Sequence, residues 1–211
     1  MKNVSIVDYG VGNLYSLHKA LKKYANASLT EEADELLNAD ALVLPGDGAF
    51  HAGMEGLRVR GLREPLLSRI RQGIPVLGIC LGAQILLSKG FEFGAWDGLG
   101  IIPGNVEKFP PLAPGAKVPH INWSPIAPGD GSWKNTILDG IPQRTHVYFV
   151  HSYILNPENP DHILAVTEYG GMKFCSAVRM DNVYGCQFHP EKSGNAGLRI
   201  IENFIRLIPS L

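Results

Sequence analysis

The stretch Ile74–Ser88, IPVLGICLGAQILLS, sets one cysteine between two glycines where two kinds of segment meet. Residues 74–80 form a short apolar run that predicts a buried strand, and residues 81–90 predict a helix that Gly90 ends. Cys80 therefore lies at a strand-to-helix corner, with Gly78 two residues before it and Gly82 two residues after it. This pattern is typical of a nucleophile elbow, a turn too tight for side chains beside the nucleophile. The alternative is an inert cysteine buried between packing glycines.

Strands and helices alternate through the first ninety residues. Residues 3–8 and 41–46 are short apolar runs that predict buried strands. Residues 14–24 and 62–73 have apolar side chains on one helical face, which predicts amphipathic helices. This alternation favours crossover connections and a parallel sheet covered by helices.

The second half of the chain has a different character. Proline and glycine crowd residues 103–131, and one apolar-faced helix is expected at residues 194–208. Between them lie four β-rich runs, which predict a mixed or antiparallel region added to the parallel sheet: residues 145–153, 162–169, 173–178 and 182–188. No linker divides the chain, so we expect one α/β domain over residues 1–211, with a mostly parallel central sheet flanked by helices.

Composition excludes several classes of protein. The chain has 211 residues, 45% hydrophobic and 18% charged, with a formal net charge of −1, which gives no basic surface for nucleic acid. We expect no signal peptide, because the first residues lack a long apolar region, and no apolar run is long enough to span a membrane. Its three cysteines form no CxxC pair, so neither a disulfide framework nor a zinc site is expected. We expect a reduced, cytoplasmic protein that needs no metal or organic cofactor.

A cysteine nucleophile needs a histidine base and a group that orients it. Of the seven histidines, His189 stands out because it follows a β-like run and precedes Pro190 and Glu191. The proline forces the chain out of the strand, and the carboxylate can accept a hydrogen bond from the imidazole. Alone, His-Pro-Glu is an ordinary strand-ending turn. Together with the elbow it predicts a triad of Cys80, His189 and Glu191.

Backbone N–H groups near the cysteine could stabilise an oxyanion. Leu81 follows the nucleophile at a helix N-terminus, where its N–H points at a carbonyl attacked by Cys80. The loop Pro45–Gly48, PGDG, follows a predicted buried strand, and its two glycines allow peptides that can rotate. A plain β-turn is the alternative for this loop.

Three motifs, in this order and spacing, resemble the class I, triad-type glutamine amidotransferases, whose fold is flavodoxin-like. They are LPGDGAF at 44–50, PVLGICLGAQILL at 75–87 and GCQFHPEKS at 185–193. Further stretches are similar to the glutaminase subunits of imidazole glycerol phosphate synthase: IVDYGVGNLYS at 6–16, KVPHINW at 117–123 and YFVHSY at 148–153. The resemblance covers nearly the whole chain.

The resemblance implies that Cys80 attacks the side-chain amide of L-glutamine, and that water then hydrolyses the thioester to glutamate. His189, oriented by Glu191, takes the thiol proton and returns it to the departing ammonia. The other roles that it implies are an oxyanion hole from Leu81, Gly46, Asp47 and Gly48, substrate binding by Gln84, His151, Ser152 and Tyr153, and a partner surface with Asn13, Trp123, Tyr148 and Lys192. The residues alone leave Trp123 and Tyr148 equally open to being core aromatics.

The resemblance also implies a partner. Members of this family form a heterodimer with a (βα)8-barrel synthase subunit of histidine biosynthesis, to which the ammonia passes. An alternative is a paralogous subunit that supplies ammonia to a related barrel protein for sugar amination in surface-polysaccharide synthesis. Two other classes share some of these features: a cysteine peptidase or thioester hydrolase, and a regulatory glutamine-binding subunit with an inactive site.

The chain departs from the family pattern at three positions. Asp47 stands where valine is usual, and a carboxylate that faced the oxyanion hole would repel the oxyanion, so we expect it to point away. Asn122 replaces a usual glycine, and asparagine is the side chain that best tolerates a positive φ. Ser124 stands where asparagine is common.

Overall fold

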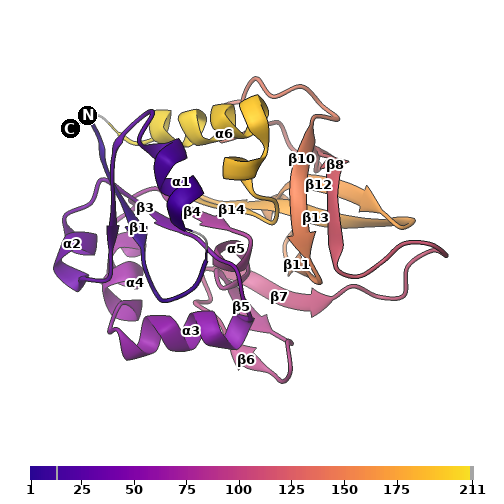
Figure 1. Ribbon diagram of the computed structural model, residues 1–211, viewed down its shortest axis with the longest axis horizontal. Coiled ribbons are helices and arrows are strands. Elements are labelled where there is room, and N and C mark those ends of the chain that lie inside the picture. The colour runs from indigo at the N-terminus through magenta and orange to yellow at the C-terminus, as the bar shows by residue number, and fades with distance from the viewer. Residues whose placement is uncertain (13, 210–211) are drawn as a thin grey trace.

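A mixed sheet runs the length of the protein in the computed structural model, which describes residues 1–12 and 14–209 (Figure 1). Within the described residues the strand order is β2-β1-β3-β4-β14-β13-β11-β7-β5-β6, and β12 and β9 branch from β13. The strands are β1 (Asn3–Val7), β2 (Asn26–Thr30), β3 (Ala41–Leu44), β4 (Val76–Ile79), β5 (Leu87–Gly90), β6 (Trp96–Asp97), β7 (Ile102–Lys108), β9 (Ala127–Pro128), β11 (Tyr153–Pro157), β12 (Ile163–Tyr169), β13 (Met172–Met180) and β14 (Val183–Cys186).

Helices cover both faces of this sheet. One face packs against α1 and α6, whose buried side chains share a core cluster with β1, β3 and β4. The other face packs against α2, α3 and α4 through a second cluster. The helices are α1 (Leu14–Leu21), α2 (Ala33–Leu37), α3 (Phe50–Val59), α4 (Arg63–Arg71), α5 (Leu81–Gln84) and α6 (Gly194–Arg206), with short 3-10 turns η1 (Pro160–His162) and η2 (Pro190–Lys192). The predicted α/β class is confirmed.

Five strands form the parallel core. Strands β2, β1, β3, β4 and β14 pair in parallel, in an order that corresponds to the flavodoxin-like 2-1-3-4-5 arrangement. In such sheets ligands bind at the carboxyl ends of the strands. β4 ends at Ile79 beside Cys186 at the end of β14. The segments that follow these two strands, with Cys80 and His189, therefore start side by side.

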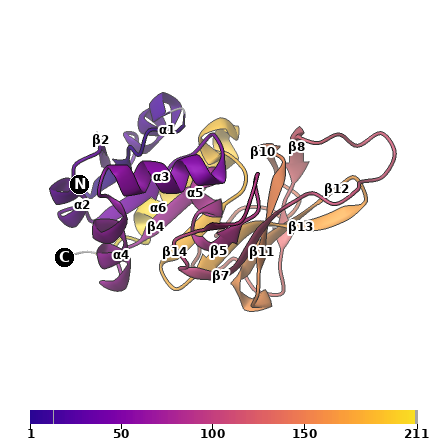
Figure 2. The same cartoon turned by 90° about the horizontal axis from the view of Figure 1, so that it is seen from below.

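The four predicted β-rich runs of the second half all contain strands, but they do not form one region. Residues 182–188 contain β14, which pairs in parallel with β4 and antiparallel with β13, and so connects the parallel core to the antiparallel part. Residues 145–153 contain β10 (His146–His151), which pairs only with β8 (His120–Pro125) in a separate antiparallel ribbon. Figure 2 shows this ribbon at the end of the molecule away from α2 and α4.

The predicted helix over residues 81–90 is wrong beyond its first turn. Helix α5 ends at Gln84, and residues 87–90 form strand β5. Ile85, Leu86 and Leu87 are all fully buried, so no side of this segment faces solvent as an amphipathic helix requires. Their carbonyl groups instead accept hydrogen bonds from the N–H groups of residues 99–102.

Candidate active site

Cys80 sits in the strained backbone of a sharp elbow between β4 and α5. Its φ is 51° and its ψ is −107°, a conformation that L-residues rarely adopt. A Cβ at Gly82 would lie 1.9 Å from the Leu44 carbonyl oxygen, and one at Gly78 would lie 2.6 Å from the Gly82 oxygen. Both glycines are therefore required by backbone-to-backbone packing around the cysteine, which accounts for the GICLG pattern.

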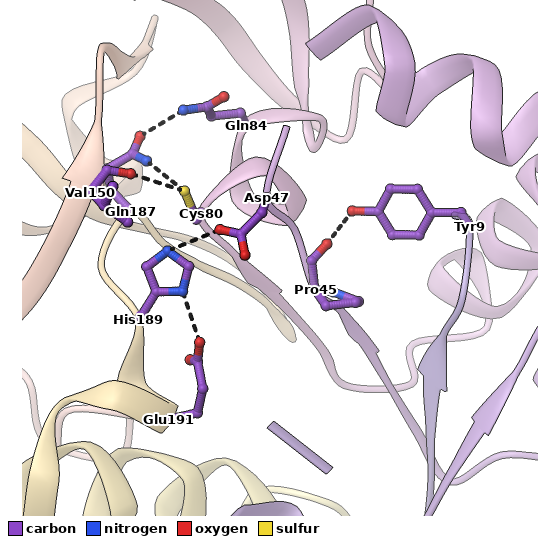
Figure 3. A network of polar contacts seen from close by, with 9 residues as sticks. All are labelled: Tyr9, Pro45, Asp47, Cys80, Gln84, Val150, Gln187, His189 and Glu191. Carbon is purple, nitrogen blue, oxygen red and sulfur yellow. Dashed lines mark hydrogen bonds and ion pairs between the residues drawn. The ribbon is translucent and has the colours of Figure 1, made fainter. Parts of the chain in front are cut away.

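Two groups approach the sulfur. The Sγ atom of Cys80 lies 3.8 Å from the Val150 carbonyl oxygen, which can accept from the thiol. The side-chain amide of Gln187 donates to Sγ over 3.7 Å. That amide is oriented by Gln84, whose Nε2 donates to Gln187 Oε1 at 3.2 Å (Figure 3). Gln187 is fully buried, so its N–H is a preorganised donor for negative charge on the sulfur.

Gln187 is missing from the sequence-based assignment. A sequence signal for Gln187 was available, because it lies in the predicted strand over residues 182–188, two residues before His189. Only the pairing of β14 with β4 brings its amide to the sulfur.

His189 and Glu191 form a buried pair. The Nδ1–H of His189 donates to Glu191 Oε1 at 2.8 Å, and both side chains are almost fully buried. Burial lowers the pKa of His189, but the charges of Cys80 and Glu191 and the hydrogen bond to Glu191 outweigh it and raise the pKa to about 10. His189 Nε2 has no hydrogen-bond partner among the described residues, so this nitrogen is available for proton transfer.

Asp47 is directed at that free nitrogen. Its Oδ1 lies 3.8 Å from His189 Nε2, and its side chain is 44% exposed (Figure 3). The imidazole thus has a carboxylate near each nitrogen, Glu191 at Nδ1 and Asp47 at Nε2. The carboxylate of Asp47 also lies on the cavity described below.

The loop that carries Asp47 is anchored from both sides. The fully buried Tyr9 donates its hydroxyl hydrogen bond to the Pro45 carbonyl, and burial raises the pKa of this tyrosine. A Cβ at Gly46 would lie 2.4 Å from Leu81 Cβ, so only glycine lets the loop rest on the elbow. Gly48 has a φ of 125°, which also favours glycine.

A cavity of about 250 Å³ opens above the sulfur. Eight residues of the sequence-based assignment line it: Asp47, Gly48, Cys80, Leu81, Gln84, His151, Ser152 and Tyr153. His189, Glu191 and Gly46 line a separate small void instead. The cavity is the size of a small molecule, and Cys80 and the residues 151–153 are among those that line it.

Glu92 is a second residue that the sequence did not single out. Its side chain lines the cavity, and its Oε2 accepts a hydrogen bond from the Phe50 N–H at 2.7 Å. The other oxygen has no hydrogen bond within residues 1–12 and 14–209, so it can meet a cationic group. Nothing in the local sequence FEFGAW marks this residue, because the loop reaches the cavity only through the pairing of β5 with β6.

Three of the four residues assigned to a partner surface lie in the described part of the chain, on β8, β10 and η2. Trp123 is 48% exposed on β8, which removes the reading of this side chain as a core aromatic. Tyr148 is half-buried opposite it on β10, with ring centroids 6.1 Å apart. Lys192 is half-buried in η2, next to Glu191. Asn13 lies outside the described residues.

Asn122 does not adopt the positive φ that its replacement of glycine suggested. It lies in the regular ladder of β8 opposite Phe149, and its Oδ1 accepts from the Trp123 N–H at 2.9 Å. The ladder pairing to β10 imposes extended backbone, so the left-handed conformation is not used here.

Residues 1–12 and 14–209 contain neither a membrane-spanning helix nor a metal-binding cluster. No helix in this part of the chain is long and apolar enough to cross a membrane. The same residues contain no group of three or more His, Cys, Asp or Glu side chains arranged to hold a metal ion.

Comparison with known proteins agrees with this geometry. The model of the family "glutamine amidotransferase class-I" matches residues 5–207. The chain is 46% identical to imidazole glycerol phosphate synthase subunit HisH 1 of Legionella pneumophila (strain Lens), over 98% of this chain and 100% of that protein. It is 45% identical to subunit HisH of Caldanaerobacter subterraneus subsp. tengcongensis, over 99% and 100%.

Solved structures share the fold. A glutamine amidotransferase crystal structure superposes with a TM-score of 0.74 at 20% identity, covering 97% of this chain and 98% of that chain. The structure of PurLQS from Thermotoga maritima gives a TM-score of 0.72 at 16% identity, covering 98% of this chain and 99% of that chain. The chain therefore belongs to the class I glutamine amidotransferases and, within them, to the HisH subunits of imidazole glycerol phosphate synthase.

Proposed function

We propose that this chain hydrolyses L-glutamine to L-glutamate and ammonia, as the glutaminase subunit of an imidazole glycerol phosphate synthase. The observation that carries the proposal is Cys80, held in a strained elbow at the base of a small cavity beside the His189–Glu191 pair. This is the arrangement of a cysteine nucleophile with an oriented base.

In the first half-reaction the Cys80 sulfur attacks the amide carbon of glutamine, and a C–S bond forms. The carbonyl oxygen becomes an oxyanion beside the N–H of Leu81, the first N–H of α5, which has no intrahelical acceptor. His189 Nε2–H then protonates the amide nitrogen as the C–N bond breaks, and ammonia leaves. A γ-glutamyl thioester remains on Cys80.

In the second half-reaction water attacks the thioester carbon while neutral His189 accepts its proton. The C–S bond breaks, glutamate leaves, and the proton returns to the sulfur–imidazole pair. Throughout both steps the Glu191 carboxylate holds His189 Nδ1–H and fixes which nitrogen faces the reaction.

The cavity wall suits the rest of glutamine. The backbone of residues 151–153 and the amide of Gln84 offer hydrogen bonds to the substrate. The Glu92 carboxylate at the same cavity matches an α-ammonium group by charge. We expect glutamine to lie with its amide at Cys80 and its amino group at Glu92.

The partner is expected to be a (βα)8-barrel synthase subunit, with which the chain forms a heterodimer and to which the ammonia passes. The exposed Ile121 and Trp123 on β8 are available for such a contact near the cavity. Ammonia that escaped to solvent would be protonated and lost to a reaction that needs the free base.

Glutamate release by Cys80→Ala tests the chemistry. We expect no activity, while Cys175→Ala, which changes a buried cysteine of β13 outside the site, keeps it. Burial raises the pKa of Cys175 to about 12, so iodoacetamide at neutral pH should label Cys80 and spare Cys175. Glutamate production by a folded Cys80→Ala protein would refute the assignment.

A further inference from the structure

Three buried side chains form a single hydrogen-bonded array beside the cavity. Ser124 Oγ lies 2.9 Å from His120 Nε2, and His120 Nδ1 lies 3.0 Å from His151 Nε2. His151 Nδ1 lies 2.8 Å from the carbonyl oxygen of Tyr153. His120 is fully buried, and Ser124 and His151 are nearly so. Neither His120 nor Ser124 lines the cavity or has a part in the chemistry described above.

The hydrogen-bond direction in this array has one solution. A carbonyl oxygen only accepts, so His151 carries its proton on Nδ1. Burial lowers the pKa of His151 to about 3 and that of His120 to about 4, so both rings are neutral. Neutral His151 therefore accepts at Nε2 from His120 Nδ1–H, and His120 accepts at Nε2 from the Ser124 hydroxyl.

Aromatic rings enclose the array and exclude water from it. The His120 ring stacks on Tyr169 with centroids 3.9 Å apart and on Phe149 at 4.9 Å. The His151 ring packs against Phe109 at 5.1 Å. A ring nitrogen that lost its hydrogen-bond partner here would have no water to bind instead. Breaking any hydrogen bond of the array therefore costs free energy.

The array ends on the cavity wall. Ser124 and His120 belong to β8, His151 ends β10, and Tyr153 begins β11. The carbonyl of Tyr153 also accepts from Gln84 Nε2 at 3.5 Å. The array thus joins the outer β8–β10 ribbon to the corner, residues 151–153, that lines the cavity beside Cys80.

We propose that His120 is a positioning residue for glutamine binding: through His151 it fixes the carbonyl of Tyr153, and with it the backbone of residues 151–153. Ser124 completes the array by supplying its last proton donor. The proposal rests on the proposed function in naming glutamine as the ligand of this corner. His120 does not contact the substrate, so its loss affects binding more than the chemical step.

Matched variants of His120 separate this role from simple packing. His120→Phe keeps a ring of similar size for stacking but removes both hydrogen bonds. His120→Asn places an amide nitrogen near the position of Nδ1 and can still donate to His151. His120→Gln reaches the position of Nε2 and Ser124 instead. If His120 acts through packing alone, His120→Phe should resemble wild type. If it acts through its hydrogen bonds, His120→Asn should resemble wild type.

The assay is glutamate release by the complex of the full chain with its barrel synthase partner. For His120→Phe and His120→Gln we expect the KM for glutamine to rise about tenfold, with kcat within about threefold, as expected when a buried polar group loses its partner. For His120→Asn we expect a KM within about threefold of wild type. An unchanged KM in folded His120→Phe, or Asn behaving like Phe, overturns the proposal.

Nitrogen-15 NMR of the wild-type full chain tests the array without activity or mutation. We expect His120 and His151 to show the neutral Nδ1–H form at neutral pH. An Nε2–H tautomer or a charged ring for either residue overturns the proposal, even if the His120 variants fail to fold. If wild type releases no glutamate, the proposed function fails while the NMR result still decides the array.

Discussion

Asp47→Asn removes the negative charge near His189 Nε2 while keeping the shape of the side chain. With the two atoms 3.8 Å apart, an effective dielectric constant of about 20 gives roughly 4 kcal/mol. The Asp47 side chain is 44% exposed, however, and solvent-exposed pairs contribute only about 0.2–1 kcal/mol. We take the Asp47 carboxylate to stabilise the His189 imidazolium by about 0.7 kcal/mol, which corresponds to about half a pKa unit.

The sign follows from the protonated form of the base. The loss of an anion destabilises the imidazolium, so the pKa of His189, about 10 in wild type, is lower in the variant. In the mechanism proposed above, imidazolium is the form whose Nε2–H protonates the departing nitrogen. We therefore expect the alkaline limb of the activity profile to move to lower pH by about half a unit.

The assay is the pH dependence of kcat for glutamate release by the partner-bound enzyme, with a nitrogen-15 NMR titration of His189 alongside. Asp181→Asn is the matched control, because Asp181 is exposed in the turn before β14, at the opposite end of that strand from His189. An alkaline limb that stays in place in Asp47→Asn, or moves to higher pH, refutes the electrostatic reasoning.

Three further variants test the elbow and the base. Gln187→Met removes the amide that donates to Cys80 Sγ. We expect the rate of iodoacetamide labelling of Cys80 to fall about tenfold, which is the scale of a hydrogen bond to a charged group. An unchanged labelling rate would contradict this role. Gly82→Ala forces a methyl group against a backbone carbonyl of β3, so we expect about 1–3 kcal/mol less stability in urea unfolding, against less than about 0.5 for the unhindered Gly131→Ala. Glu191→Gln should reduce kcat at least about 100-fold, because the imidazole loses its orienting carboxylate. Cys80 and Glu191 together raise the pKa of the imidazole, so wild type holds its extra stability below pH 6.5 and loses it as the pH rises towards about 10. In urea unfolding at several pH values, this loss should be smaller for Glu191→Gln.

The elbow was predictable because its signal is local. Gly78 and Gly82 are required by backbone packing around Cys80, and both lie within the five residues 78–82 of the sequence. The parallel core was predictable for a similar reason, since each buried strand and amphipathic helix has its own periodicity. Two such strands, placed side by side, bring Cys80 and His189 together.

The parts that sequence did not predict depend on contacts between distant segments. Residues 85–90 have a helix-like composition, but residues 98–102 supply hydrogen bonds that make them a strand. Glu92 reaches the cavity on a loop that carries no motif. The Asp47 carboxylate and His189 are 142 positions apart in the sequence and lie near each other only in the folded chain. The pairing of His120 with His151 likewise needs the register of β8 against β10.

Glutamate release with and without a histidine-pathway barrel synthase, loaded with its ribotide ligand, is the decisive measurement for the proposed function. We expect strong stimulation of the wild-type chain and none of Cys80→Ala. A folded chain that binds glutamine but is not stimulated by this barrel would contradict the assignment to imidazole glycerol phosphate synthase. Stimulation that persists in Cys80→Ala would contradict the chemistry itself.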